Sequence, residues 1–123
     1  MPVETEVLEL EQGKVLCLTP VGVDTFREDM SLPKVAEKSM TPEIHGIMVD
    51  FGRLELIDSI GLGKITGLAI KFRKKVPIVL VNMDAIVANV FRVSNMHKVF
   101  DVCPTRQEGL DHLQQAMKKA KEV

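Results

Sequence analysis

The chain has 123 residues, of which 46% are hydrophobic and 27% are charged, the balance of a soluble globular domain. Its 16 basic and 17 acidic residues leave a formal charge of −1, which excludes a global electrostatic attraction to nucleic acid or to an anionic membrane. No apolar stretch reaches the roughly 20 residues that a membrane span needs. We therefore expect a single domain over residues 1–123 with one core.

The first part of the chain predicts a hairpin, a helix and a buried strand. Val7–Glu11 and Lys14–Thr19 have strand composition and are separated by a two-residue turn. Asp24 is placed to cap a helix that Pro33 interrupts or splits. The apolar run Ile44–Phe51 is typical of a strand that is covered on both faces.

A strongly helical pattern follows over residues 60–75. Its apolar residues recur at three- and four-residue spacing, and the opposite side carries Lys64, Lys71 and Lys75. We interpret these lysines as a solvated helix face, with contacts to a partner as the alternative.

The last part alternates strands and helices. Ile78–Val81 predicts a buried strand after Pro77, and Val99–Cys103 a short final strand. Asp84 opens a helix that Asn95 ends in a left-handed conformation, and Thr105 with Glu108 forms a capping box for the last helix. The expected inner side of the helix after Asp84 consists of Ile86, Val87, Val90, Phe91 and Ser94.

The order of these elements predicts the fold class. Strands and helices alternate after the hairpin, which implies right-handed crossovers and parallel strand pairing. We therefore expect an α/β domain with a single, mostly parallel sheet that has one antiparallel edge and is flanked by about four helices.

The two cysteines and the N-terminal residues indicate in which cellular compartment the protein is expected. Cys17 and Cys103 each lie in an apolar, strand-like run, which predicts buried thiols and not a disulfide or a metal pair. The acidic N-terminal residues lack the pattern of a signal peptide. We expect a cytoplasmic protein.

The segment from Leu56 to Gly63 contains the candidate functional residue, Ser59. Its apolar start ends in Asp58-Ser59, and the helical pattern begins directly afterwards. Ser59 is therefore expected at a helix N-terminus, where free N–H groups and the helix dipole favour negative charge. It could be a plain N-cap, a nucleophile, a ligand for a bound phosphate, or a phosphorylation site.

Spacing argues against two of these hypotheses. Gly61 and Gly63 are separated by one residue and Ile65 follows Lys64, which excludes a Walker loop. The dinucleotide fingerprint is excluded because Thr66 stands where it needs Gly or Ala. We expect the small residues to let the first helical turn pack closely under the strand ends. A nucleophilic serine would need a base, but His45 lies near the far end of the preceding strand, roughly 20 Å away. No spacing of histidines and carboxylates matches a metal site.

Phosphorylation of Ser59 is the better hypothesis. A phosphate would add about −1.5 to −2 charges at a helix N-terminus, which tolerates them. Next to Asp58, with Asp24 expected across the loops, it would make the surface strongly acidic. A partner surface that fits the neutral serine would then be repelled without unfolding of the domain.

Several segments resemble one known family. Val49-Asp50-Phe51 and the run Asp58-Ser59-Ile60-Gly61-Leu62-Gly63 are similar to the core of the STAS domain family, and in particular to bacterial anti-sigma factor antagonists. Gly22-Val23-Asp24, Val79–Asn82 and the end of the chain also resemble that family.

The resemblance implies a function as well as a STAS-like fold. In such proteins the serine matched here by Ser59 is phosphorylated by an anti-sigma factor with serine kinase activity. The unphosphorylated form binds that kinase and frees the sigma factor, and a metal-dependent serine phosphatase resets the switch. ATP and magnesium belong to the kinase, so we expect no enzymatic activity, no cofactor and no direct nucleic-acid contact for this chain.

The partner contacts implied by the resemblance lie around Ser59. One residue departs from the pattern, because Ile60 stands where close relatives usually carry a second Ser or Thr. The alternative is a scaffold that is not phosphorylated, or a nucleotide- or anion-binding subunit of a stress-signalling or transport complex. The residues expected to contact the partner are Asp24, Asp58, Ser59, Ile60, Gly61, Leu62, Gly63 and Lys64.

Overall fold

The computed structural model describes residues 3–22, 32–55, 57 and 59–122. Five strands form one sheet in the order β1-β2-β3-β4-β5, with β1 and β2 antiparallel and all other neighbours parallel. This arrangement confirms the predicted fold class. In chain order the elements are β1 Val3–Leu10, β2 Gly13–Pro20, α1 Leu32–Ser39, β3 Ile44–Asp50, α2 Ser59–Phe72, β4 Ile78–Val81, α3 Ala85–Val93, a 3-10 turn at Met96–Lys98, β5 Asp101–Cys103 and α4 Arg106–Glu122.

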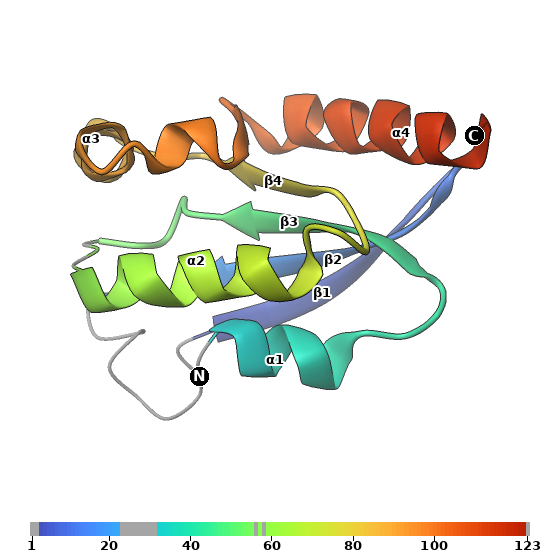
Figure 1. Ribbon diagram of the computed structural model, residues 1–123, viewed down its shortest axis with the longest axis horizontal. Helices are drawn as coiled ribbons and strands as arrows, with labels where there is room; N and C mark the ends of the chain where they lie inside the picture. Colours follow the sequence, from blue (N-terminus) through green and yellow to red (C-terminus); the bar gives the residue numbers. More distant parts are fainter. Residues whose placement is uncertain (1–2, 23–31, 56, 58, 123) are drawn as a thin grey trace.

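The helices cover both faces of the sheet (Figure 1). Alternation along the strands divides the apolar residues, because successive side chains point to opposite faces. Leu16, Ile47 and Leu80 belong to the larger core under α1, α2 and α3. Val15, Met48 and Val79 belong to the smaller core under α4. The two-sided burial that the apolar runs predicted is thereby confirmed.

The N-terminal hairpin is longer than the sequence predicted. β1 starts at Val3 instead of Val7, and its register with β2 runs from Val3 opposite Pro20 to Leu10 opposite Gly13. The acidic composition of residues 4–6 concealed this strand, whereas Val3 is 5% exposed and packs into the larger core.

The cysteine prediction is confirmed in part. Cys17 is fully buried in β2, Cys103 is half-buried in β5, and both are free thiols. Burial raises the pKa of the Cys17 thiol to about 11. Cys17 is therefore an unreactive thiol at neutral pH, because the nucleophilic form of cysteine is the thiolate.

Pro33 lies in the first turn of α1, where its missing N–H costs no helical hydrogen bond. The earlier part of the predicted helix, with Asp24 as its cap, lies outside the described residues. Pro33 also approaches α2 closely, since a Cβ added at Gly67 would lie 3.3 Å from its ring.

Helix α3 follows the prediction at its ends but not along its faces. The backbone N–H of Val87 donates to Asp84 Oδ1 at 2.8 Å, and Asn95 adopts the left-handed conformation with φ 62°. Val87 and Phe91 are buried, but Ile86 is 60% exposed and Ser94 is also exposed. The predicted inward orientation of Ile86 and Ser94 is therefore wrong. A nine-residue helix at the end of the sheet buries only one narrow stripe.

The C-terminal elements are close to those predicted. β5 begins at Asp101 rather than Val99, because Val99 and Phe100 close the preceding 3-10 turn through hydrogen bonds to the carbonyl of Met96. The Glu108 N–H donates to Thr105 Oγ1 at 3.2 Å, which confirms that Thr105 caps α4. Among the described residues no helix is both long and apolar enough to cross a membrane.

Candidate functional site

The candidate site lies at the carboxyl end of the parallel strands, where α2 begins (Figure 1). Helix α2 starts at Ser59, so the positive end of its dipole lies at this edge of the sheet. Such an edge is where α/β sheets commonly bind their ligands. The prediction that Ser59 stands at a helix N-terminus is confirmed.

The candidate residues differ in how accessible they are. Gly61 is buried, Leu62 and Lys64 are half-buried, and Gly63 is exposed. A Cβ added at Gly63 would have no atom within 4 Å, so close packing does not require a glycine there, contrary to our expectation. The residues Asp24 and Asp58, and the side chains of Ser59 and Ile60, lie outside the described part, and their contacts remain predictions.

The loop before α2 is fixed from two sides. Leu54 and Ile57, each 4% exposed, anchor it in the larger core. The N–H of Gly22, in the loop after β2, donates to the carbonyl of Arg53 at 3.1 Å, and the Glu55 N–H donates to the Gly22 carbonyl at 3.2 Å. Gly22 has φ +84°, a conformation that favours glycine. These two backbone hydrogen bonds join the loop after β2, which leads to Asp24, to the loop after β3, which leads to Ser59.

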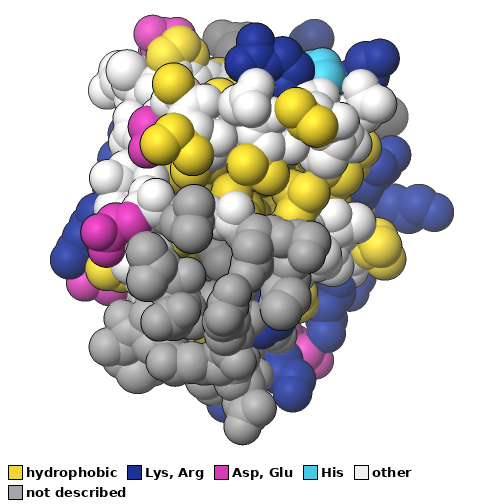
Figure 2. All heavy atoms as spheres, turned by 90° about the vertical axis from the view of Figure 1, so that its left-hand side faces the viewer, with side chains coloured by type: hydrophobic (Ala, Val, Ile, Leu, Met, Phe, Trp, Pro, Cys, Tyr) yellow, Lys and Arg dark blue, Asp and Glu magenta, His cyan; other side chains and the backbone are white. Residues whose placement is uncertain are grey.

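An apolar surface on α3 lies at the same end of the molecule. Ile86, Val90 and Val93 occupy one side of α3 at positions i, i+4 and i+7, and we call them the α3 face. Ile86 is 60% exposed, Val93 is 76% exposed, and Val90 is half-buried. Figure 2 shows hydrophobic side chains gathered on this end of the molecule. Exposed apolar groups that cluster in this way are typical of protein contact surfaces.

Sequence reasoning missed this surface because α3 is apolar on two sides. The stripe of Val87 and Phe91 and the stripe of Ile86 and Val90 fit helical spacing equally well. The available signal was the excess of apolar residues, since a nine-residue surface helix buries only one of the two stripes.

A buried carboxylate lies beneath the site at the end of β3. Asp50 is 7% exposed, and its Oδ1 accepts hydrogen bonds from the Gly52 N–H at 2.8 Å and from Asn82 Nδ2 at 3.0 Å. Its Oδ2 accepts from Arg106 Nε at 2.6 Å. Burial alone would raise the pKa of Asp50, but the hydrogen bonds from Arg106, Gly52 and Asn82 outweigh it and hold this pKa below its ordinary value.

The hydrogen bonds to Asp50 make the stability of the fold depend on pH, and a substitution of Asp50 tests this dependence. A depressed native pKa means that the Asp50 carboxylate contributes stability above the unfolded pKa of about 3.9, and that this stability is lost as the pH falls below it. We expect Asp50→Asn to lower the free energy of unfolding by about 1–3 kcal/mol relative to the wild type near pH 7. This difference in stability, measured by urea titration, should become smaller toward pH 3.

The matched control for this prediction is Glu37→Gln. It removes a carboxylate that pairs with Lys71 Nζ at 2.5 Å on the surface, where solvent screens the pair. The control should show no comparable gap at either pH. A stability gap for Asp50→Asn that is the same at both pH values would contradict the assignment.

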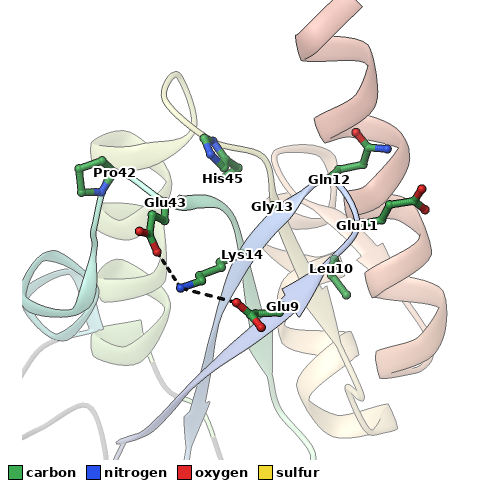
Figure 3. Close-up of a pocket in the computed structure, with 9 residues that line it drawn as sticks. All are labelled: Glu9, Leu10, Glu11, Gln12, Gly13, Lys14, Pro42, Glu43 and His45. Carbon is green, nitrogen blue, oxygen red and sulfur yellow. Dashed lines mark hydrogen bonds and ion pairs between the residues drawn. The ribbon is translucent and has the colours of Figure 1, made fainter.

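The predicted residues Lys71, Lys75 and His45 lie away from the start of α2. Lys71 is exposed on α2, as predicted. Lys75 is exposed in the turn that follows, because α2 ends at Phe72 and not at residue 75 as the sequence predicted. His45 lines an open hollow of about 780 Å³ at the opposite end of the sheet (Figure 3). There Lys14 Nζ lies 2.7 Å from Glu43 Oε2 and 3.7 Å from Glu9 Oε1. No group of metal-ligating side chains occurs among the described residues.

The fold and the serine at the start of α2 define a STAS-like domain. The STAS domain model matches residues 11–109, and the chain therefore belongs to the STAS domain family. A comparison with curated protein sequences gives no match.

Solved structures share the fold at low sequence identity. An anti-sigma factor antagonist from Mycobacterium paratuberculosis is 17% identical, with a TM-score of 0.71 over 91% of this chain and 94% of that one. A variant of RsbS from Moorella thermoacetica is 19% identical, with a TM-score of 0.65 over 89% and 96% of the two chains. The anti-sigma factor antagonist SpoIIAA in its unphosphorylated form is 18% identical, with a TM-score of 0.64 over 91% and 97%. These similarities confirm the fold.

Proposed function

We propose that this STAS domain is an anti-sigma factor antagonist that acts by partner switching. In the unphosphorylated state it binds an anti-sigma factor serine kinase, and phosphorylation of Ser59 releases that kinase. The kinase transfers the γ-phosphoryl group of ATP to the Ser59 hydroxyl oxygen, ADP leaves, and the hydroxyl proton passes to a base of the kinase. A metal-dependent serine phosphatase would restore the serine, so the chain controls sigma-factor-dependent transcription without a cofactor of its own.

The observation that carries this proposal is the start of α2 at Ser59, at the same end of the molecule as the α3 face. The positive end of the α2 dipole tolerates a phosphate, so the fold should survive the modification. An apolar partner surface that covers the α3 face would desolvate the added charge, and an uncompensated charge in an interface is costly. The switch therefore acts on binding and not on folding.

The structural neighbours support this assignment at the level of class. Two of them are anti-sigma factor antagonists, and one is described in its unphosphorylated form, which implies a phosphorylated counterpart of that protein. What departs from the family pattern in this chain is Ile60, the residue directly after Ser59.

The test is phosphorylation by the cognate anti-sigma kinase. Incubation with the kinase, ATP and magnesium should add one phosphate, and peptide mass spectrometry should map it to Ser59. Ser59→Ala should take up no phosphate. The control is Ser94→Ala, which removes an exposed serine at the C-cap of α3 and should leave the modification unchanged. Phosphate retained by the Ser59→Ala protein would contradict the site assignment.

A further inference from the structure

We propose that Asp50 is a positioning residue that holds the two halves of the docking surface in fixed relation to each other. The halves are the start of α2, which carries Ser59, and the α3 face. This inference rests on the proposed function, and it concerns a residue that itself lies buried beneath the surface.

The first half is held through the turn that follows β3. The Gly52 N–H donates to Asp50 Oδ1 at 2.8 Å, and the Phe51 N–H donates to the carbonyl of Val81 at 3.0 Å, which extends the pairing of β3 with β4. These bonds set the point from which the chain leaves the sheet toward Leu54, Ile57 and α2. A displaced turn would carry the start of α2 with it.

The second half is held through the residue that follows β4. Asn82 donates from Nδ2 to the same Asp50 oxygen at 3.0 Å. Its backbone has φ 60°, a left-handed conformation that costs free energy in a residue other than glycine and that the surroundings must maintain. Asn82 stands two residues before Asp84, the cap of α3, so its conformation sets the direction in which α3 and the α3 face leave the sheet.

The second carboxylate oxygen of Asp50 accepts a hydrogen bond from helix α4. Arg106, in the first turn of α4, donates from Nε to Asp50 Oδ2 at 2.6 Å and from a guanidinium nitrogen to Glu6 of β1 at 3.2 Å. The guanidinium therefore bonds to Oδ2 and leaves Oδ1 for the two loops. Because one oxygen atom accepts from both Gly52 and Asn82, the loops cannot move independently while this geometry persists.

A partner that touches both halves depends on their relative placement. Displacements of about 1 Å in a recognition or catalytic geometry can lower efficiency by large factors. Loss of the network should therefore weaken the productive complex with the kinase, even in a domain that remains folded.

The experiment compares Arg106→Gln and Asp50→Asn with Lys14→Gln. The control removes a surface ion pair at the opposite end of the sheet (Figure 3). Steady-state phosphorylation of Ser59 is measured at a temperature at which circular dichroism shows all proteins fully folded. We expect both network variants to raise KM about tenfold and to change kcat by less than about threefold, and the control to change neither. A merely structural role predicts unchanged constants for folded protein.

Amide NMR provides a second measurement that needs no kinase. In Arg106→Gln, a residue outside both loops, we expect shifts at Gly52, Asn82, Gly61 and Ile86, and the control should leave these amides in place. Shifts confined to the surroundings of residue 106, or an unchanged KM, would overturn the inference. If the kinase phosphorylates no form of the protein, the proposed function fails, and the amide shifts alone decide whether Asp50 positions the two loops.

Discussion

Phe91→Ala is expected to lower the free energy of unfolding by about 3–5 kcal/mol, a large part of the stability of a small domain. Phe91 is fully buried on α3. Its ring packs edge-on against Phe51 at a centroid distance of 5.7 Å and against Phe100 at 6.4 Å. Truncation would leave a cavity where α3, the end of β3 and the segment before β5 meet. Urea denaturation monitored by circular dichroism measures the loss.

The matched control is Val93→Ala on the same helix. Val93 is 76% exposed, so its truncation should change the free energy of unfolding by less than about 0.5 kcal/mol. Similar losses in the two variants would contradict the arrangement of α3, in which one side is core and the other is the α3 face.

Ser59→Asp is expected to weaken binding of the anti-sigma kinase by a factor of about 100 or more, because an uncompensated charge in an interface costs several kcal/mol. The melting temperature should change little, because the N-terminus of α2 accommodates a negative charge. Isothermal titration calorimetry and thermal melts of the same preparations measure the two effects.

Thr41→Asp provides the control for charge alone. Thr41 is exposed in the turn before β3, at the end of the sheet opposite to Ser59. The same added charge at that position should leave the affinity for the kinase within about twofold of the wild type, because solvent screens exposed charges beyond about 10 Å. Equal weakening by both variants would show that net charge, not its position, controls binding.

Most of the fold was predictable because local signals and tertiary packing agree. The strand Ile78–Val81 has its predicted bounds, since Pro77 precedes a fully apolar run. The cap at Asp84 and the left-handed Asn95 follow from side-chain chemistry that acts within a few residues. The start of α2 at Ser59 was predictable for the same reason.

The errors arose where long-range partners decide. Nothing local in residues 3–6 indicates a strand, because the stability of this part of β1 comes from pairing with β2. On α3, two apolar stripes have helical spacing and only one of them is buried, so the prediction that Ile86 faces inward was wrong. The network around Asp50 joins residues as much as 100 positions apart, so spacing along the chain could not reveal the role of Arg106. The available signal was an acidic residue at the end of an otherwise apolar strand.

The central claim is that phosphate on Ser59 switches binding without unfolding the domain. The most direct measurement titrates one preparation of the anti-sigma kinase with the unphosphorylated protein and with protein phosphorylated at Ser59, and records the thermal melt of both forms. We predict an affinity for the phosphorylated form that is lower by a factor of about 100 or more, with nearly equal melting temperatures. Equal affinities, or an affinity loss that accompanies a large fall in melting temperature, would contradict the account.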